Sequence, residues 1–484
     1  MLVGWWSLED YGYSIWSLAH TLSMAIGIRL QLGWPEYSLS VRLACSYPDC
    51  TTPAPRSASH PTGVLPAMSR HSSLQKLIFN SLCLTILAIT IAPLGATGEE
   101  PLTQVDVFEA GVGGYAMYRI PGVVVTPKGT ILAYCEARRT GKSDWDEINI
   151  LMRRSIDGGK TFLEPQHVAH QGDKVPKNPL AIKQKLGLQP EATVNNPVAV
   201  VDRKSGRITM LYCVEYSRCF AMHSDDEGAT FSKPRDITAA LEKLRQEYPW
   251  FVVAIGPGHA IQLKNGRLVA AVWLSTGEGG HAHRPSVTTT LVSDDGGETW
   301  SAGEIAARPT DTIVNPNETT LAELSDGTVM LNIRSESKPN RRLITLSKNG
   351  SSGWSEPKFD EALVEPICMA SLLAVPTREQ QLLIYAGPDN LTSAKTKEPK
   401  PGTGRDRKNL TVQLSRDDGQ TWTAKRVLEP GPSAYSDLAV GPDGRVHCFF
   451  ERCKAVGTGS PYARLSLVSF KPDWITQPAT ATSK

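Results

Sequence analysis

Apolar and polar residues alternate along short stretches of the chain from Val105 onward, and turns that mostly bear Gly separate successive stretches. A period of two predicts β-strands, and a turn such as Asn265-Gly266 or Asp326-Gly327 between two such stretches predicts a hairpin. One helix is predicted within 236–248, where apolar residues recur at the helical period ahead of Pro249. Six successive hairpins have their turns near Gly129, Gly206, Gly266, Gly327, Arg378 and Gly444.

A short motif, S-x-D-x-G-x-T-[W/F], follows most of these hairpins. In this motif the Asp side chain can accept hydrogen bonds from its own turn, Gly supplies positive φ, and the aromatic residue packs under the hairpin. The motif therefore joins two further strands and carries no chemistry. Its copies are SIDGGKTF (155–162), SDDEGATF (224–231), SDDGGETW (293–300) and SRDDGQTW (415–422), with a variant SKNGSSGW at 347–354. The steps between successive starts are 69, 69, 54 and 68 residues.

Two hairpins per unit make a four-stranded antiparallel sheet, and six units predict an all-β fold, a six-bladed β-propeller. The last unit has only one strand, 464–470, after its first hairpin. We expect the segment 105–110 to supply the missing strand, which closes the ring and removes its free edges. The alternative is a β-sandwich with appendages; six similar units over about 370 residues fit a ring better.

The 484-residue chain divides into three parts. Residues 1–67 show no sustained period, whereas 68–96 open with Met, carry two basic residues and an apolar run, and end in small residues. The second pattern predicts a secretory signal peptide cleaved near Ala96, with a membrane anchor as the alternative. A signal peptide belongs at an N-terminus, so 1–67 are interpreted as a spurious or disordered extension and 97–484 as the propeller. We expect an exported protein, periplasmic or secreted, with no stable membrane span after cleavage.

The formal net charge of +2 gives no overall bias toward nucleic acid, so any anion-binding site must be local. The six cysteines after Ala96 lie mostly on apolar stretches and favour buried free thiols, and no disulfide pairing is predicted. The chain has no C-x-x-C, and the H-x-H at His281 and His283 lacks a carboxylate partner at a metal-binding spacing. We therefore expect neither a metal nor a cofactor.

Antiparallel geometry places several reactive side chains together on one rim. The Gly-bearing turns and the repeated motifs both lie on one rim, so the starts of first and third strands and the ends of second strands lie on the opposite rim. Arginines that gather there need an anion among them, and a guanidinium group binds a carboxylate in a bidentate fashion, so we expect a ligand with a carboxylate, with a phosphate or sulfate as the alternative. The alternative is that each arginine is a separate surface residue. The residues at these positions are Arg119, Arg138, Arg139, Asp144, Glu318, Arg334, Arg407, Tyr435 and Glu451.

The YRIP segment at 118–121 and the repeated Asp boxes give the chain a resemblance to the exo-sialidases (neuraminidases), six-bladed propellers that hydrolyse terminal sialic acids. The resemblance covers about 105–470 and implies a role for each rim residue. Arg119, Arg334 and Arg407 would clasp the carboxylate of the sugar, Glu451 would hold Arg119, and Arg138 would join in substrate binding. Tyr435 would be the nucleophile, Glu318 its base, and Asp144 the general acid/base, with Asp146 as the alternative acid.

The chemistry explains the use of a phenol. The anomeric carbon of sialic acid bears a carboxylate that would repel an anionic nucleophile, whereas a neutral tyrosine with a pKa of ~10 needs a base such as Glu318. Attack would give a covalent glycosyl intermediate and net retention. By the resemblance, the substrates are sialylated glycans, glycoproteins or glycolipids, and we expect a monomer. A sequon at Asn317, where a glycan would obstruct the cleft, favours a bacterial exported enzyme.

Two other functions remain open. A trans-sialidase or intramolecular trans-sialidase would share every residue named and differ in the acceptor admitted. A non-catalytic glycan-binding propeller would also carry Asp boxes. Such a scaffold has no reason to hold Tyr435, Glu318 and three arginines together.

Overall fold

The computed structural model describes residues 31–32, 39–40, 102–169, 174–455 and 457–477. The chain forms two compact units, Met1–Ala96 and Thr97–Lys484. In the first, β1 (Gln31–Leu32) pairs antiparallel with β2 (Leu39–Ser40). The rest of the predicted extension and the whole predicted signal peptide lie outside the described residues, so both stay predictions. Among the helices that the structure describes, none has the length and apolar character needed to cross a bilayer.

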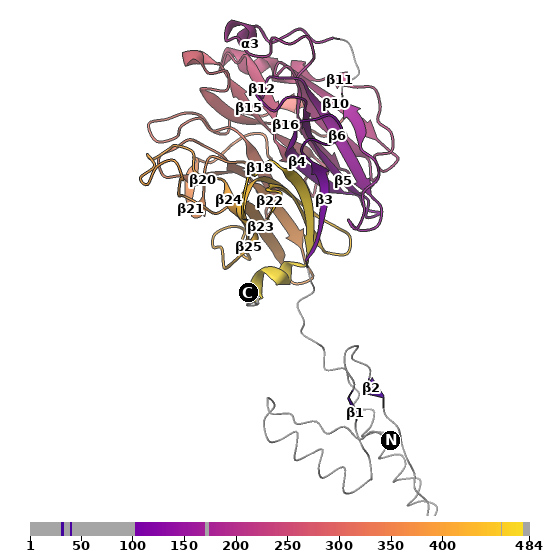
Figure 1. Cartoon of the computed structure of the whole chain (residues 1–484). Coiled ribbons are helices and arrows are strands. Elements are labelled where there is room, and N and C mark those ends of the chain that lie inside the picture. Colours follow the sequence, from indigo (N-terminus) through magenta and orange to yellow (C-terminus); the bar gives the residue numbers. More distant parts are fainter. Residues whose placement is uncertain (1–30, 33–38, 41–101, 170–173, 456, 478–484) are drawn as a thin grey trace, which may run out of the picture. The chain divides into compact units, whose positions relative to one another are not determined.

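The second unit is built from antiparallel sheets that follow one another along the chain (Figure 1). The first sheet contains β4 (Met117–Val125), β5 (Ile131–Arg138), β6 (Ile148–Ser155) and β7 (Gln166–Ala169). The second contains β8 (Val194–Val201), β9 (Ile208–Val214), β10 (Arg218–Ser224) and β11 (Arg235–Asp236), with β13 (Gly258–His259) parallel to β8.

Two further sheets follow in the same manner. The third contains β12 (Val252–Ile255), β14 (Ile261–Gln262), β15 (Leu268–Ser275), β16 (Ser286–Ser293) and β17 (Ser301–Ala302), where β12 and β14 both pair with β15. The fourth contains β18 (Thr319–Glu323), β19 (Val329–Ile333), β20 (Arg341–Ser347) and β21 (Lys358–Val364).

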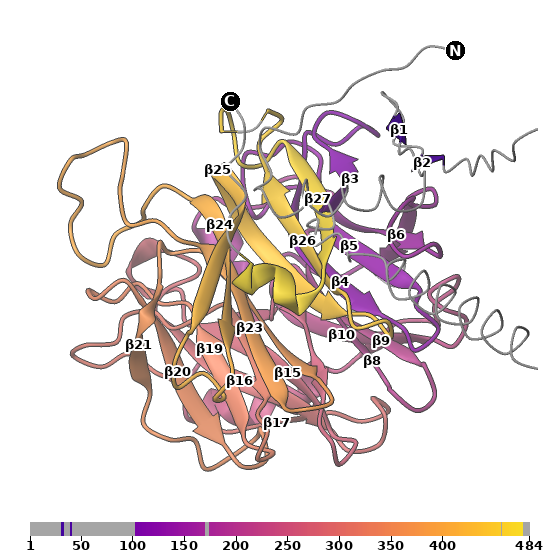
Figure 2. The same cartoon turned by 90° about the horizontal axis from the view of Figure 1, so that it is seen from below.

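The last sheet has seven strands and joins the two ends of the unit. It contains β22 (Ser371–Pro376), β23 (Gln381–Pro388), β24 (Lys408–Ser415), β25 (Ala424–Val440), β26 (Val446–Arg452), β27 (Arg464–Phe470) and β3 (Thr103–Glu109). The pairing of β3 with β27 confirms that the segment 105–110 supplies the strand missing from the last unit. Figures 1 and 2 show this closure as yellow C-terminal strands beside purple N-terminal ones.

Strand β25 is long because it belongs to both halves of the seven-stranded sheet. Its first half pairs with β24 and its second half with β26, and the register shifts between Ser433 and Ser436 where the strand changes partner. One apolar cluster contains buried residues from both halves of the sheet, such as Ile384 on β23, Val412 on β24 and Cys448 on β26. The seven-stranded sheet therefore bends at β25, and its two halves pack against each other.

The core lies between successive sheets, because the second strand of each sheet is covered on both faces. Strands β5, β9 and β15 are buried along their whole length, whereas the outer strand β21 is largely exposed. Such strands read as nearly continuous apolar runs. A cluster of residues from β4 to β7 packs on residues from β8 to β10, and another joins β3 to β5 with β25 to β27. Strands β4, β8, β14, β18, β22 and β25 all contribute residues to one cavity of about 250 Å³.

The Asp boxes form the predicted turns. In the box at 293–300, Ser293 Oγ donates to Asp295 Oδ1 at 2.7 Å, and the Thr299 N–H donates to the same oxygen at 2.9 Å. Hydrogen bonds from Thr299 lower the pKa of Asp295 to about 2. The closing Trp300 is partly buried against the core. These contacts fix the turn on the rim away from the reactive side chains.

Helices are few and short in the described part of the chain. The predicted helix at 236–248 is present as a 3₁₀-helix, η1 (Thr238–Gln246), which buries Leu241 and Leu244. The others are α3 (Pro179–Lys183), η2 (Glu278–Gly280) and η3 (Pro472–Thr476). The expectation of buried free thiols is confirmed for Cys135, Cys213, Cys219, Cys368, Cys448 and Cys453.

Candidate active site

Tyr435 lies at the centre of the candidate site. It sits on β25 within the register shift between Ser433 and Ser436, and such a bulge redirects a side chain out of the sheet. Its hydroxyl lies 2.6 and 2.7 Å from the two carboxylate oxygens of Glu318, to which it donates. The same hydroxyl accepts a hydrogen bond from Arg334 Nη1 at 2.8 Å. A buried phenol is thus held between a carboxylate and a guanidinium group.

Three arginines from different sheets converge on this tyrosine. Arg334, just beyond β19, also donates to Glu318. The guanidinium carbon of Arg119 lies 4.9 Å from the centre of the Tyr435 ring, and that of Arg407 lies 5.2 Å from it. The structure therefore brings together the arginines that the sequence placed on one rim.

A fully buried carboxylate holds Arg119. Glu451 accepts from Arg119 Nε at 2.9 Å and from Nη2 at 3.3 Å. It also accepts from the backbone N–H groups of Ile120 at 3.1 Å and Tyr435 at 3.0 Å. Strand β4 changes register between Arg119 and Gly122, and Ile120 there has a φ of 59°. Glu451 thus ties two segments of the site together.

Arg407 is held without a carboxylate. Its Nη2 donates to the carbonyl oxygen of Ile367 at 2.7 Å, and its Nη1 donates to the hydroxyl of Tyr462 at 3.3 Å. Over the described ranges, no ion pair joins Arg407 to an acidic residue. Since Arg119 has Glu451 and Arg334 has Glu318, the three arginines share two carboxylates. We call the three arginines together with Glu318 and Glu451 the cup. The cup has a net positive charge and can therefore bind an anion.

Arg138 and Asp144 form a second charged group beside the cup. Arg138 Nη1 lies 2.6 Å from Asp144 Oδ1, and its Nη2 lies 2.7 Å from the buried Glu136. The Asp144 side chain is 48% exposed and so is open to a ligand. The alternative acid, Asp146, accepts instead from the hydroxyl of Thr140. The geometry therefore favours Asp144 over Asp146 for contact with a bound molecule.

The charges set the resting protonation states. Burial raises the pKa of Tyr435 far above its usual value, although Arg334 opposes this rise. Burial also raises the pKa of Glu318, but the charges of Arg334 and Arg407 and the hydrogen bonds from Arg334 and Tyr435 together outweigh burial, so the pKa of Glu318 is lowered. At Asp144, partial desolvation by the surrounding protein raises the pKa, but Arg138, His283 and Arg119 together outweigh this effect, so the pKa of Asp144 is also lowered. At neutral pH the phenol is protonated and both carboxylates are ionised.

Sequence reasoning missed two residues of the site. Glu136 lies within the apolar strand β5, and a charged residue there signals a buried partner, which is Arg138. Tyr462 lies in a loop, and no pattern in the sequence marks it. Its ring lies under Arg119, with 4.3 Å between the guanidinium carbon and the ring centre. Tyr462 thus contacts two of the three arginines.

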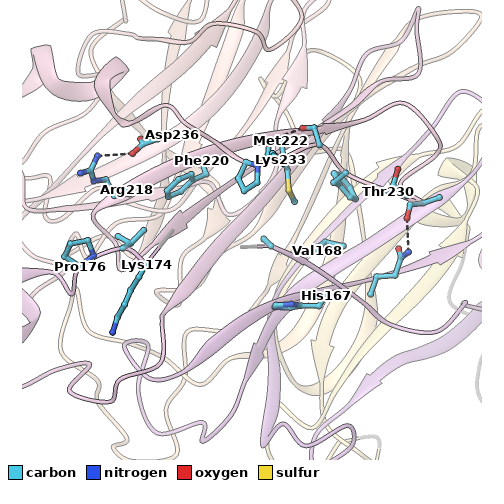
Figure 3. Close-up of a pocket in the computed structure, with 17 residues that line it drawn as sticks. His167, Val168, Lys174, Pro176, Arg218, Phe220, Met222, Thr230, Lys233 and Asp236 are labelled. Atoms are coloured by element: carbon cyan, nitrogen blue, oxygen red, sulfur yellow. Dashed lines mark hydrogen bonds and ion pairs between the residues drawn. The ribbon is translucent and has the colours of Figure 1, made fainter. Parts of the chain in front are cut away.

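A large groove lies elsewhere on the unit. It has a volume of about 1010 Å³ and runs between β7 and the strands β10 and β11. Figure 3 shows its side chains, including the ion pair of Arg218 with Asp236. None of the predicted site residues lines this groove. No cluster of metal-binding side chains occurs among the residues with described positions.

Comparison with known sequences points to one kind of protein. A family model described as "BNR repeat-like domain" matches residues 177–448. The chain is 30% identical over 408 residues to a sialidase of Micromonospora viridifaciens and 28% identical over 358 residues to a sialidase of Bacteroides fragilis. These matches cover 78% and 68% of the chain but only 56% and 58% of the two relatives. A match to Sialidase-3 of Bos taurus, 28% identical, covers 69% of the chain and 85% of that relative.

Comparison with solved structures also finds similarity to sialidases and a trans-sialidase. The Hadza microbial sialidase Hz136 superimposes with a TM-score of 0.61 at 26% identity, over 77% of this chain and 69% of that one. The intramolecular trans-sialidase of Ruminococcus gnavus, solved with oseltamivir carboxylate, gives a TM-score of 0.58 at 17% identity. That match covers 77% of this chain and 98% of the other, and it bears on the fold alone.

Proposed function

The chain belongs to the sialidase family with BNR repeats, and from this premise we propose that it is an exo-α-sialidase that hydrolyses terminal sialic acids with retention. One observation carries the proposal. Three arginines that share two carboxylates surround a phenol, which donates to a partly buried glutamate. This arrangement suits a sugar that bears its own carboxylate next to the reacting carbon.

Each residue has a defined part in the proposed reaction. The carboxylate of the sugar binds among Arg119, Arg334 and Arg407. The Tyr435 oxygen attacks the anomeric carbon while its proton passes to Glu318, and the bond to the leaving oxygen breaks. The leaving oxygen takes a proton from Asp144.

The second half of the reaction reverses these transfers. Asp144, now ionised, accepts a proton from water, and the water oxygen attacks the anomeric carbon. The bond to Tyr435 breaks and Glu318 returns the proton to the phenol. Two displacements at one carbon give net retention. Because Arg138 lowers the pKa of Asp144 in the free protein, the acid must gain its proton before or during substrate binding.

We also propose the finer architecture predicted from the sequence, a ring of six four-stranded blades. It is supported by the one cavity to which strands of successive sheets contribute residues, and by the pairing of β3 with β27. In this arrangement β25 is the outer strand of the fifth blade and the inner strand of the sixth. Sialylated glycans as substrates, export from the cell and a monomeric state belong to the same proposal.

The experiment is an assay of purified protein on a fluorogenic α-sialoside, with the anomer of the first product read by NMR. Release of the α-anomer of sialic acid supports a retaining hydrolase. An anhydro product would indicate an intramolecular trans-sialidase, and transfer to an added acceptor sugar would indicate a trans-sialidase. Binding of the sialoside without turnover would indicate the other alternative, a non-catalytic glycan-binding propeller.

A further inference from the structure

The carbonyl group that holds Arg407 belongs to a residue in an unusual conformation. Ile367 lies between β21 and β22 with a φ of 66°. Among the non-glycine residues with positive φ in the described ranges, Ile120 and Ile367 are the two β-branched ones. For a β-branched residue this region is strongly disfavoured, and such outliers persist only where the surroundings impose them. Both isoleucines adjoin an arginine of the cup.

A buried ion pair binds the backbone of the residue that follows Ile367. Glu365 Oε1 accepts from the backbone N–H of Cys368 at 2.7 Å, and Arg342 Nη1 donates to the carbonyl oxygen of Cys368 at 3.1 Å. Arg342 also donates to Glu365 Oε2, and neither side chain is exposed. We call Arg342 and Glu365 the clamp. It fixes both peptide groups of Cys368, directly after Ile367.

The clamp is itself anchored to the neighbouring strand. Arg342 Nε donates to the side-chain oxygen of Asn332 on β19 at 2.6 Å, and Nη2 donates to the backbone oxygen of the same residue at 2.9 Å. Arg334, another arginine of the cup, lies two residues beyond Asn332. The clamp thus connects the segments that carry two of the three arginines.

We propose that the clamp positions Arg407 for the carboxylate of the ligand, through the carbonyl group of Ile367. The inference deepens the proposed function and rests on it. A purely structural pair would stabilise the fold and leave anion recognition unchanged. A similar arrangement occurs at Arg119, where the buried Glu451 accepts hydrogen bonds both from the backbone N–H of Ile120 and from the guanidinium group of Arg119.

The test compares free sialic acid with its methyl ester, which lacks the negative charge and carries one additional methyl group. Dissociation constants are measured by calorimetry for the wild type, Glu365→Gln, Arg407→Ala and the double variant. We expect Glu365→Gln to weaken binding of the acid about tenfold and binding of the ester less than about twofold. In the Arg407→Ala background, Glu365→Gln should cause no further loss. Glu336→Gln, which breaks the Arg284–Glu336 pair on the same unit, is the control and should leave the ratio of acid to ester unchanged.

Equal weakening of both ligands, or full additivity with Arg407→Ala, would show that the clamp is structural only and overturn the proposal. Should Glu365→Gln fail to give a cooperative thermal transition, Arg342→Lys keeps both buried charges and removes the fork of hydrogen bonds. The same loss confined to the acid is expected of it. A wild type that binds the acid but does not hydrolyse sialosides would refute the proposed function and leave the clamp standing. A wild type that binds neither ligand would refute both.

Discussion

Replacing Tyr435 with Phe removes one oxygen atom from the centre of the cup. That oxygen makes contacts of 2.6 and 2.7 Å to Glu318 and 2.8 Å to Arg334. Glu318 and Arg334 still pair with each other afterwards, so no buried charge is left alone, and the free energy of unfolding should fall by about 1–2 kcal/mol. Loss of the nucleophile should lower kcat by about 10³-fold or more, which corresponds to about 4 kcal/mol in the activation free energy.

The assay separates turnover from binding. Initial rates on a fluorogenic α-sialoside give kcat, and calorimetry with free sialic acid gives the dissociation constant. Binding should stay within about threefold of the wild type, because the three arginines remain in place. Full activity in the Phe variant would refute the nucleophile assignment. An equal loss of binding and of turnover would show instead that the hydroxyl only organises the cup.

Four other substitutions test separate parts of the site and fold. Arg407→Ala should raise KM about tenfold or more in initial-rate kinetics, and an unchanged KM would point to Arg405. Asp144→Asn should lower kcat/KM most for sialosides with poor leaving groups, and an equal loss on activated aryl sialosides would count against an acid role. Arg138→Met should raise the pKa of Asp144, because Arg138 is the strongest of the groups that lower it, and the alkaline limb of the kcat–pH profile should move upward by about one unit. Asp295→Ala should lower the free energy of unfolding by about 1 kcal/mol in denaturant titrations and leave kcat unchanged, since its turn lies on the other rim.

Much of the fold could be predicted because it depends on local patterns. The Asp boxes and the glycine turns each specify a hairpin, and the antiparallel order then decides on which rim a side chain lies. That reasoning placed Arg119, Arg334 and Arg407 on one rim without any contact being known. The Thr103–Glu109 strand could be assigned to the last unit because the final sheet lacked one strand.

Other features depend on contacts between distant residues. The segment 424–440 contains Pro430, Gly431 and Pro432, which read as a break, yet β25 runs through them because its register shifts there. The positive φ of Ile367 has no signature in sequence, since isoleucine normally avoids it. Nothing in the sequence distinguishes Arg342 from the neighbouring Arg341, and its burial depends on contacts with the distant residues Glu365 and Cys368 and with Asn332.

Binding of the substrate carboxylate would change the net charge of the cup, because the three arginines are paired with only two carboxylates in the free protein. In the free protein Glu318 is held by Arg334, which lowers its pKa and makes it a weak base. A substrate carboxylate that binds among the arginines brings a negative charge beside Arg334 and competes for its hydrogen bonds. The interaction of Arg334 with Glu318 then weakens and the pKa of Glu318 rises, because a nearby anion disfavours a second one. In the proposed reaction, Glu318 therefore becomes a stronger base at the step in which Tyr435 loses its proton, and a residue that positions Arg407 would also serve this proton transfer.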